Sequence, residues 1–197
     1  MNLPNKLTML RVLMVPLFLV FIYLEQIPYH FLWAALTFIA ASVTDWLDGQ
    51  IARSQGLVTT FGKFLDPLAD KILVITALAV FVELEDVQMS AIPLVIIIAR
   101  EFMVSGLRLL AMEAGVVVPA GIWGKLKTAF TMLTIVVILL YLVLLHDFSW
   151  AVSIPEHVTE LLRTWVLGSL IWISTALTVI SGVVYLKNGW KYVGATK

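Results

Sequence analysis

Apolar residues gather into six long stretches along the chain, separated by short polar segments rich in turn-forming residues. The stretches cover residues 7–24, 31–47, 65–82, 90–112, 126–145 and 166–186. Each is close to the ~20 residues that an α-helix needs to cross the hydrocarbon core of a membrane. Because backbone groups in lipid must hydrogen-bond within their own segment, the pattern predicts six transmembrane helices rather than strands.

The composition supports lipid as the main solvent of this chain. Of the 197 residues, 61% are hydrophobic and 13% are charged, and the mean hydropathy is +0.99. Soluble domains are nearer half apolar and a quarter charged. The formal net charge of zero and the absence of cysteine exclude zinc fingers and a broadly basic nucleic-acid surface. We therefore expect an all-α integral membrane bundle, folded as a single domain over residues 1–197.

Positive charges are distributed unequally between the two sides of this bundle. One side holds the two termini and the connections after the second and fourth stretches, with Lys6, Arg11, Arg53, Lys63, Lys71, Arg100, Arg108, Lys125, Lys127, Lys187, Lys191 and Lys197. The other side holds Arg163 with Glu25, Glu83, Glu85, Asp86, Asp147, Glu156 and Glu160, which are expected to be solvated connections. Since cytoplasmic loops are enriched in Lys and Arg, both termini are predicted to be cytoplasmic.

Four aspartates lie where the second stretch ends and the third begins. Asp45 and Asp48 are three residues apart, and Asp66 and Asp70 are four apart, so each pair shares one face of a helix. Ionisable groups at the edge of a membrane helix are costly and are candidates for function. Clustered carboxylates need counter-charge, and oxygen-only ligands favour Mg²⁺ or Mn²⁺. The pattern predicts a two-ion site suited to phosphoryl transfer, in a polar cavity at the cytoplasmic side.

Small residues flank the aspartates. Gly49 and Ala52 lie one turn apart, and Gly62 lies one turn before Asp66. They would let a diphosphate approach the backbone closely, although small residues also serve close packing of membrane helices. Pro67 is expected in the first turn of the third helix, where its missing N–H is harmless.

These residues form the pattern D-x-x-D-G-x-x-A-R, eight residues, G-x-x-x-D-x-x-x-D. It resembles the signature of the CDP-alcohol phosphotransferases at every defined position, and the six-helix layout is similar too. Enzymes of this family transfer the phosphoalkyl group of a CDP-linked lipid or alcohol to a hydroxyl and release CMP. The resemblance implies that Asp45, Asp48, Asp66 and Asp70 hold the metals, with Asp70 also acting as the base. It implies nucleotide or diphosphate contacts from Thr8, Asp48, Gly49, Ala52, Arg53 and Gly62. Two alternatives to ligand binding remain open. Arg53 would only anchor the cytoplasmic side of the bundle, and Thr8 would only lie at an ordinary helix start.

Four segments outside the signature indicate the acceptor. They are residues 3–11, 99–101, 105–108 and 124–128, and they resemble the bacterial branch of the family that makes phosphatidylglycerol phosphate from CDP-diacylglycerol and glycerol 3-phosphate. An acceptor with its own phosphate needs cations. The candidates are Arg108, Lys125 and Lys127, with Arg100 as a second-tier residue that is expected to pair with Glu101. Lys125 and Lys127 do not share a helix face, so one is expected to face the site and the other lipid headgroups, to which such cations are also attracted.

Two other readings remain open. A transferase of the same fold could use another acceptor, as a phosphatidylinositol-phosphate synthase or a cardiolipin synthase does. A divalent-cation transporter could also carry carboxylates in its bundle, although these would be expected at mid-membrane on broken helices. The family resemblance further suggests a homodimer in a bacterial inner membrane.

Overall fold

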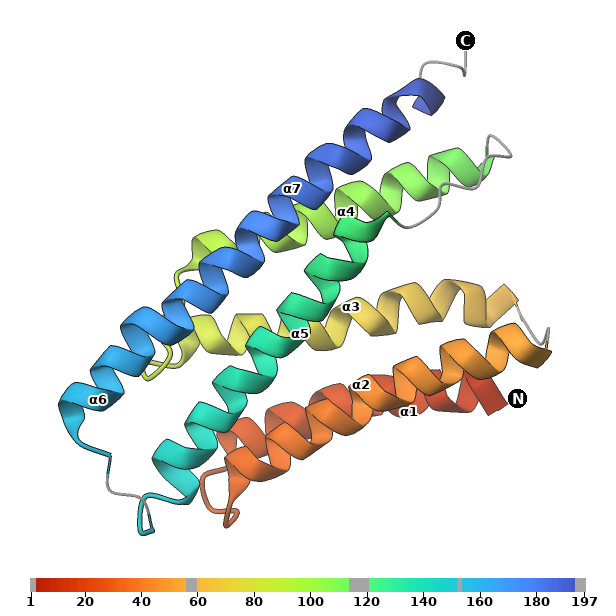
Figure 1. Ribbon diagram of the computed structural model, residues 1–197. Coiled ribbons are helices and arrows are strands. Elements are labelled where there is room, and N and C mark those ends of the chain that lie inside the picture. The colour runs from red at the N-terminus through yellow and green to blue at the C-terminus, as the bar shows by residue number, and fades with distance from the viewer. Residues whose placement is uncertain (1–2, 56–59, 114–120, 152–153, 194–197) are drawn as a thin grey trace. The chain divides into compact units, whose positions relative to one another are not determined.

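The computed structural model describes residues 3–55, 60–113, 121–151 and 154–193 (Figure 1), and side chains within residues 9–44, 71–112, 121–151 and 154–187. The elements in order are α1 (Leu3–Tyr23), α2 (His30–Gln55), α3 (Thr60–Glu83), α4 (Ala91–Glu113), α5 (Ile122–Leu142), the π-helix η1 (Val143–Asp147), α6 (Glu156–Leu161), the π-helix η2 (Leu162–Leu167) and α7 (Gly168–Val193). The η1 segment continues α5, and α6, η2 and α7 follow one another without a break. Over the described residues the chain is all-helical, and each of the six apolar stretches falls on a helix.

Two helices extend further than hydropathy predicts. The α2 helix continues beyond Asp48 to Gln55, and α3 begins at Thr60, ahead of Gly62. The expectation that Pro67 lies in the first turn of the third helix is therefore wrong, since it lies well inside α3. The apolar run marks only the part of a helix suited to lipid, whereas the i to i−4 hydrogen bonds continue through polar residues beyond it.

The first compact unit comprises Met1–Val80 and Ile135–Thr159. In it α1 packs along α2, and the rings of Phe18 and Phe38, both fully buried, lie with their centroids 6.2 Å apart. Ala34 and Ala41 of α2 are also fully buried. Small side chains at these positions let the two helix backbones approach closely, which is how membrane helices gain packing contacts.

Asp147, at the end of η1, lies against the start of α2 in the same unit. The backbone N–H of Leu32 donates a hydrogen bond of 2.6 Å to Asp147 Oδ2, and Asp147 is buried with 9% exposure. The expectation that Asp147 belongs to a solvated connection is wrong. The first turn of a helix has unpaired N–H groups and a partial positive charge, so a carboxylate is stabilised there even when it is buried.

The second compact unit comprises Phe81–Thr134 and Glu160–Lys197. Its main packing is between α4 and α7. Buried hydroxyls connect helices within it, since Thr131 Oγ1 and Ser174 Oγ, from α5 and α7, lie 2.8 Å apart. Thr131 also donates to the carbonyl of Lys127, and Thr178 to that of Ser174, so these hydroxyls are satisfied inside an apolar environment.

Two helical stretches of the described chain are long and apolar enough to cross a membrane, Ile122–Asp147 and Glu156–Lys187, with mean hydropathy 2.6 and 1.9. Two shorter apolar parts, Met9–Tyr23 and His30–Thr44, lie in α1 and α2. Length and apolar composition of this kind indicate association with a membrane.

Candidate active site

The four signature aspartates lie on two helices of the first unit. Asp45 and Asp48 are in α2, and Asp66 and Asp70 are in α3. Because both segments are helical at these positions, each pair shares one face of its own helix, as the spacing predicts. Their side chains lie outside the described residues, so the distances between carboxylates remain predictions.

The expected nucleotide and diphosphate residues also lie on helices. Thr8 is in α1, while Gly49, Ala52 and Arg53 are in α2 and Gly62 is in α3. The side-chain contacts of these five residues lie outside the described part of the chain. Elsewhere, the described side chains contain no group of three His, Asp or Glu that could hold a metal ion. The four carboxylates of the signature are the donor set that fits a hard divalent cation.

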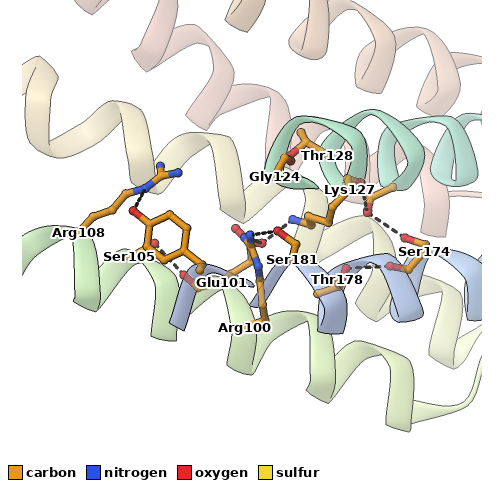
Figure 2. A network of polar contacts seen from close by, with 12 residues as sticks. Arg100, Glu101, Ser105, Arg108, Gly124, Lys127, Thr128, Ser174, Thr178 and Ser181 are labelled. Carbon is orange, nitrogen blue, oxygen red and sulfur yellow. Dashed lines mark hydrogen bonds and ion pairs between the residues drawn. The ribbon is translucent and has the colours of Figure 1, made fainter. Parts of the chain in front are cut away.

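A polar cluster occupies the interior of the second unit (Figure 2). Glu101 of α4 lies between two cations, with its Oε1 3.0 Å from Arg100 Nη1 and also in contact with Lys127 Nζ of α5. The side chains of Arg100, Glu101 and Lys127 are 10%, 15% and 7% exposed. Arg100 Nη2 donates a hydrogen bond of 2.5 Å to Ser181 Oγ of α7. Glu101 thus connects α4 to α5, and Arg100 extends the cluster to α7. The expected pairing of Arg100 with Glu101 is observed.

The sequence allows this cluster because α7 has no side chain where Arg100 passes. A Cβ atom built on Gly182 would lie 3.1 Å from Arg100 Cγ and 3.5 Å from Met103 Cε. The guanidinium therefore passes the α7 backbone at Gly182 and reaches Ser181. Small residues at helix contacts allow such close approach in membrane proteins.

Arg108 is positioned by an aromatic ring rather than by a carboxylate. Its Nε donates a hydrogen bond of 3.0 Å to the hydroxyl of Tyr185 on α7, and its guanidinium carbon lies 5.4 Å from the ring centroid. Tyr185 is buried, whereas Arg108 is exposed. Arg108 has no ion pair within the described residues, so its terminal nitrogens can bind an anionic ligand.

Lys125 and Lys127 face different environments, as their spacing predicts. Lys127 is buried with 5% exposure and contacts Glu101, while Lys125 is exposed and has no ion pair within the described chain. The structure therefore brings Arg100 and Lys127 together through Glu101. It leaves Arg108 and Lys125 without a carboxylate partner among the described residues.

Sequence reasoning missed the contribution of α7 to this cluster. The polar residues Ser174, Thr178, Ser181 and Tyr185 follow one another at spacings of four, three and four in an otherwise apolar helix. Residues at such spacings lie on one helix face. This stripe was the available signal, and it marks the face of α7 that carries the partners of Arg100 and Arg108.

Comparison with known proteins assigns the family. The family model of the CDP-alcohol phosphatidyltransferases matches residues 1–180, which include the signature and the basic residues of α4 and α5. The chain belongs to this family. It is similar to proteins named CDP-diacylglycerol–glycerol-3-phosphate 3-phosphatidyltransferase from several bacteria. The Bacillus subtilis protein is 37% identical over 96% of each chain, that of Rickettsia bellii 36% over 97% of each, and that of Pseudomonas fluorescens 36% over 98% of this chain and 92% of its own.

Proposed function

We propose that the chain transfers the phosphatidyl group of CDP-diacylglycerol to sn-glycerol 3-phosphate, giving phosphatidylglycerol phosphate and CMP. The observation that carries the proposal is the similarity, over nearly the full length of both chains, to bacterial enzymes named for this reaction. The signature residues on α2 and α3 and the basic residues on α4 and α5 supply the chemistry that such a reaction needs.

The reaction replaces one phosphorus–oxygen bond by another. The primary hydroxyl of glycerol 3-phosphate attacks the phosphorus that bears the diacylglycerol, and the bond from this phosphorus to CMP breaks, with the electron pair leaving on CMP. Asp70 accepts the hydroxyl proton. A carboxylate is far too weak a base to form a free alkoxide, so this proton moves as the new bond forms.

Asp45, Asp48, Asp66 and Asp70 are proposed to hold two divalent ions, Mg²⁺ or Mn²⁺, which fits the use of divalent metals in this family. When bound, the ions would neutralise charge on the diphosphate and on the departing CMP. Arg53 would bind diphosphate oxygens, and Gly49, Ala52 and Gly62 would leave room for them beside the backbone. Thr8 is the proposed contact of α1 with the nucleotide.

The acceptor phosphate is proposed to bind Arg108 and Lys125 directly. This assignment is supported by their lack of a carboxylate partner in the described residues. Arg100 and Lys127 share Glu101, so these three described residues together have one excess positive charge. That charge would attract the acceptor phosphate while both side chains keep their structural contacts.

The protein is proposed to span the bacterial inner membrane six times, with both termini in the cytoplasm, and to form a homodimer. The two long apolar stretches support insertion. Large apolar side chains exposed along the helices, such as Leu13, Val95, Leu133 and Ile173, also support it. A water-soluble domain would rarely expose so many.

The deciding experiment supplies purified protein and labelled CDP-diacylglycerol with each acceptor in turn, and measures CMP release and the lipid product. We expect turnover with glycerol 3-phosphate that is lost on chelation and restored by Mg²⁺ or Mn²⁺. Turnover with inositol phosphate or phosphatidylglycerol in its place would assign one of the sister activities. Cation transport without CMP release would assign the transporter.

Asp70→Asn tests the role of the base. It removes the proton acceptor and a metal ligand, so we expect CMP release to fall by ~10²–10⁴-fold. Glu85→Gln is the matched control, because it also neutralises one carboxylate but on an exposed connection outside the signature. Equal activity of the two variants would exclude Asp70 from catalysis.

A further inference from the structure

A cavity of about 190 Å³ lies in the second unit, at the starts of α4 and α7. Its lining includes Gln88, Ser90 and Pro93 near the start of α4, Arg163 of η2, and Ile171 and Trp172 of α7. The four proposed acceptor-binding residues all belong to the described chain, and none of them lines this cavity. A water molecule occupies about 30 Å³ of liquid volume, so the space is several times larger than one water.

Arg163 gives this cavity its charge. Its Nε is buried and has no hydrogen-bond partner, and its guanidinium forms no ion pair within the described residues. The lining contains no Asp or Glu among the described residues. Glu160, one turn earlier, is not paired with Arg163 either. The Nε of Arg163 is buried without an acceptor among the described residues, so it loses hydration without compensation and favours an anion from outside the chain.

Two irregular pieces of backbone form the walls of the cavity. Arg163 and Thr164 lie in η2, a π-helical segment inserted between α6 and α7, and such segments occur frequently at functional sites. In the connection between α3 and α4, Gln88 has a φ of 52°, in the left-handed region that a residue with a side chain rarely adopts. Backbone of this kind persists where the surrounding structure maintains it, often around a ligand.

The remaining lining suggests an amphipathic ligand. Pro93, Ile171 and Trp172 supply apolar surface next to the guanidinium. Trp172 is 54% exposed and Trp165, on η2, is 70% exposed. Exposed tryptophans of membrane helices gather at the level of the lipid headgroups. We propose that this cavity binds the phosphate-bearing headgroup of an anionic phospholipid, with Arg163 on the phosphate. The inference rests on the proposed membrane insertion but not on the proposed acceptor.

The test uses Trp172 as a probe in the lining of the cavity. A protein with Trp172 as its single tryptophan, the other six changed to Phe, is reconstituted in phosphatidylcholine vesicles. A small fraction of the lipid is phosphatidylglycerol or phosphatidylcholine with brominated chains, and bromine quenches nearby tryptophan. We expect brominated phosphatidylglycerol to quench Trp172 at much lower fractions than brominated phosphatidylcholine. Arg163→Gln should weaken this preference about tenfold, since it removes a charge-assisted hydrogen bond.

Matched variants distinguish lipid binding in the cavity from general effects of positive charge. Lys187→Gln removes one positive charge from α7 outside the cavity and should preserve the preference, as should Arg163→Lys. A protein with Trp150 as its single tryptophan reports ordinary lipid contact, because Trp150 is 75% exposed and does not line the cavity. A preference that survives in Arg163→Gln, or one that Trp150 shows equally, would overturn the proposal.

Further measurements identify the source of the phosphate and detect misfolded variants. Inorganic phosphate at matched ionic strength should leave the quenching unchanged, and displacement by it would overturn the lipid assignment in favour of a free anion. In the protein with all its tryptophans, native mass spectrometry should count fewer retained phosphatidylglycerol molecules after Arg163→Gln. CMP release is assayed in every sample, so active protein without the lipid preference refutes this proposal alone. Absence of quenching by either lipid would instead refute membrane insertion.

Discussion

Within the described residues Glu101 is a carboxylate shared by two cations, and this sharing gives the two lysines of α5 different surroundings. A buried ion is costly unless it is paired, and removing one partner leaves the other uncompensated. Lys127 is therefore bound to its position by Glu101, while Lys125, two residues earlier, is exposed. The sequence contains two similar lysines, but one is buried against Glu101 and the other is exposed, which agrees with the proposed binding of the acceptor phosphate by Lys125.

Lys127→Met and Lys125→Met test this division. Lys127→Met removes a buried charge-assisted hydrogen bond, which should cost about 1.5–3 kcal/mol and lower the Tm by several degrees. Lys125→Met should leave the Tm unchanged and raise the KM for glycerol 3-phosphate ~10-fold or more, because it removes a phosphate contact. Thermal unfolding in detergent and steady-state kinetics give both readouts. The division is wrong if Lys125→Met lowers the Tm as much as Lys127→Met does.

At the scale of single elements, the start of α2 depends on a residue distant in sequence. Asp147 accepts the N–H of Leu32 at 2.6 Å, and it does so from the end of the π-helix η1. Asp147→Ala should destabilise the protein by about 1–2 kcal/mol, because it removes both a helix cap and a favourable interaction with the helix dipole. Asp147→Asn retains an acceptor oxygen and should lose less. Ser149→Ala, on the exposed turn nearby, is the control, and a Tm equal to that of Asp147→Ala would exclude the capping role.

Close packing of α4 against α7 depends on Gly182. Arg100 is held by Glu101 and Ser181, so it cannot move freely away from a new side chain on Gly182. Gly182→Leu should therefore cost about 1–3 kcal/mol through overpacking. Gly106→Leu is the matched control, because a Cβ on Gly106 of α4 meets nothing within 4 Å and Leu is the better helix former. Thermal unfolding should separate the two variants, and similar Tm values would contradict the assigned contact.

Hydropathy predicts the elements of this chain well because apolar residues outnumber all others and each run is close to one membrane thickness. It ends α2 too early and begins α3 too late, since polar residues such as Asp48 continue a helix without raising its hydropathy. It also cannot reveal the contact of Asp147 with Leu32, which joins positions 115 residues apart in sequence. For the site, the spacing of the aspartates and glycines indicates the chemistry. The sharing of Glu101 depends on a contact between α4 and α5, which no local pattern encodes.

For the whole molecule, the distribution of charge predicts sidedness as well as function. The signature and twelve of the thirteen Lys and Arg residues are expected on one side, and Arg163 alone on the other. CDP-diacylglycerol, glycerol 3-phosphate and CMP would then meet the protein from the cytoplasm, where the charged substrates are made. The cavity around Arg163 would face the opposite leaflet, so its lipid would be separate from the substrates.

The absence of cysteine from the natural sequence makes this sidedness directly measurable. Two exposed positions can each receive a cysteine, as Ser149→Cys and Gly121→Cys. Ser149 lies between α5 and α6, on the side predicted to be extracytoplasmic. Gly121 lies just before α5, on the side predicted to be cytoplasmic. A membrane-impermeant maleimide applied to spheroplasts should label Ser149→Cys at once and Gly121→Cys only after permeabilisation. The reason is that cytoplasmic loops are enriched in Lys and Arg, which predicts that the segment with Lys125 and Lys127 is cytoplasmic. The reverse pattern would invert the topology and place the signature aspartates outside. Labelling of both positions in intact spheroplasts would place both outside, with an even number of crossings between them. That result contradicts α5 as a single span and would refute the six-span arrangement.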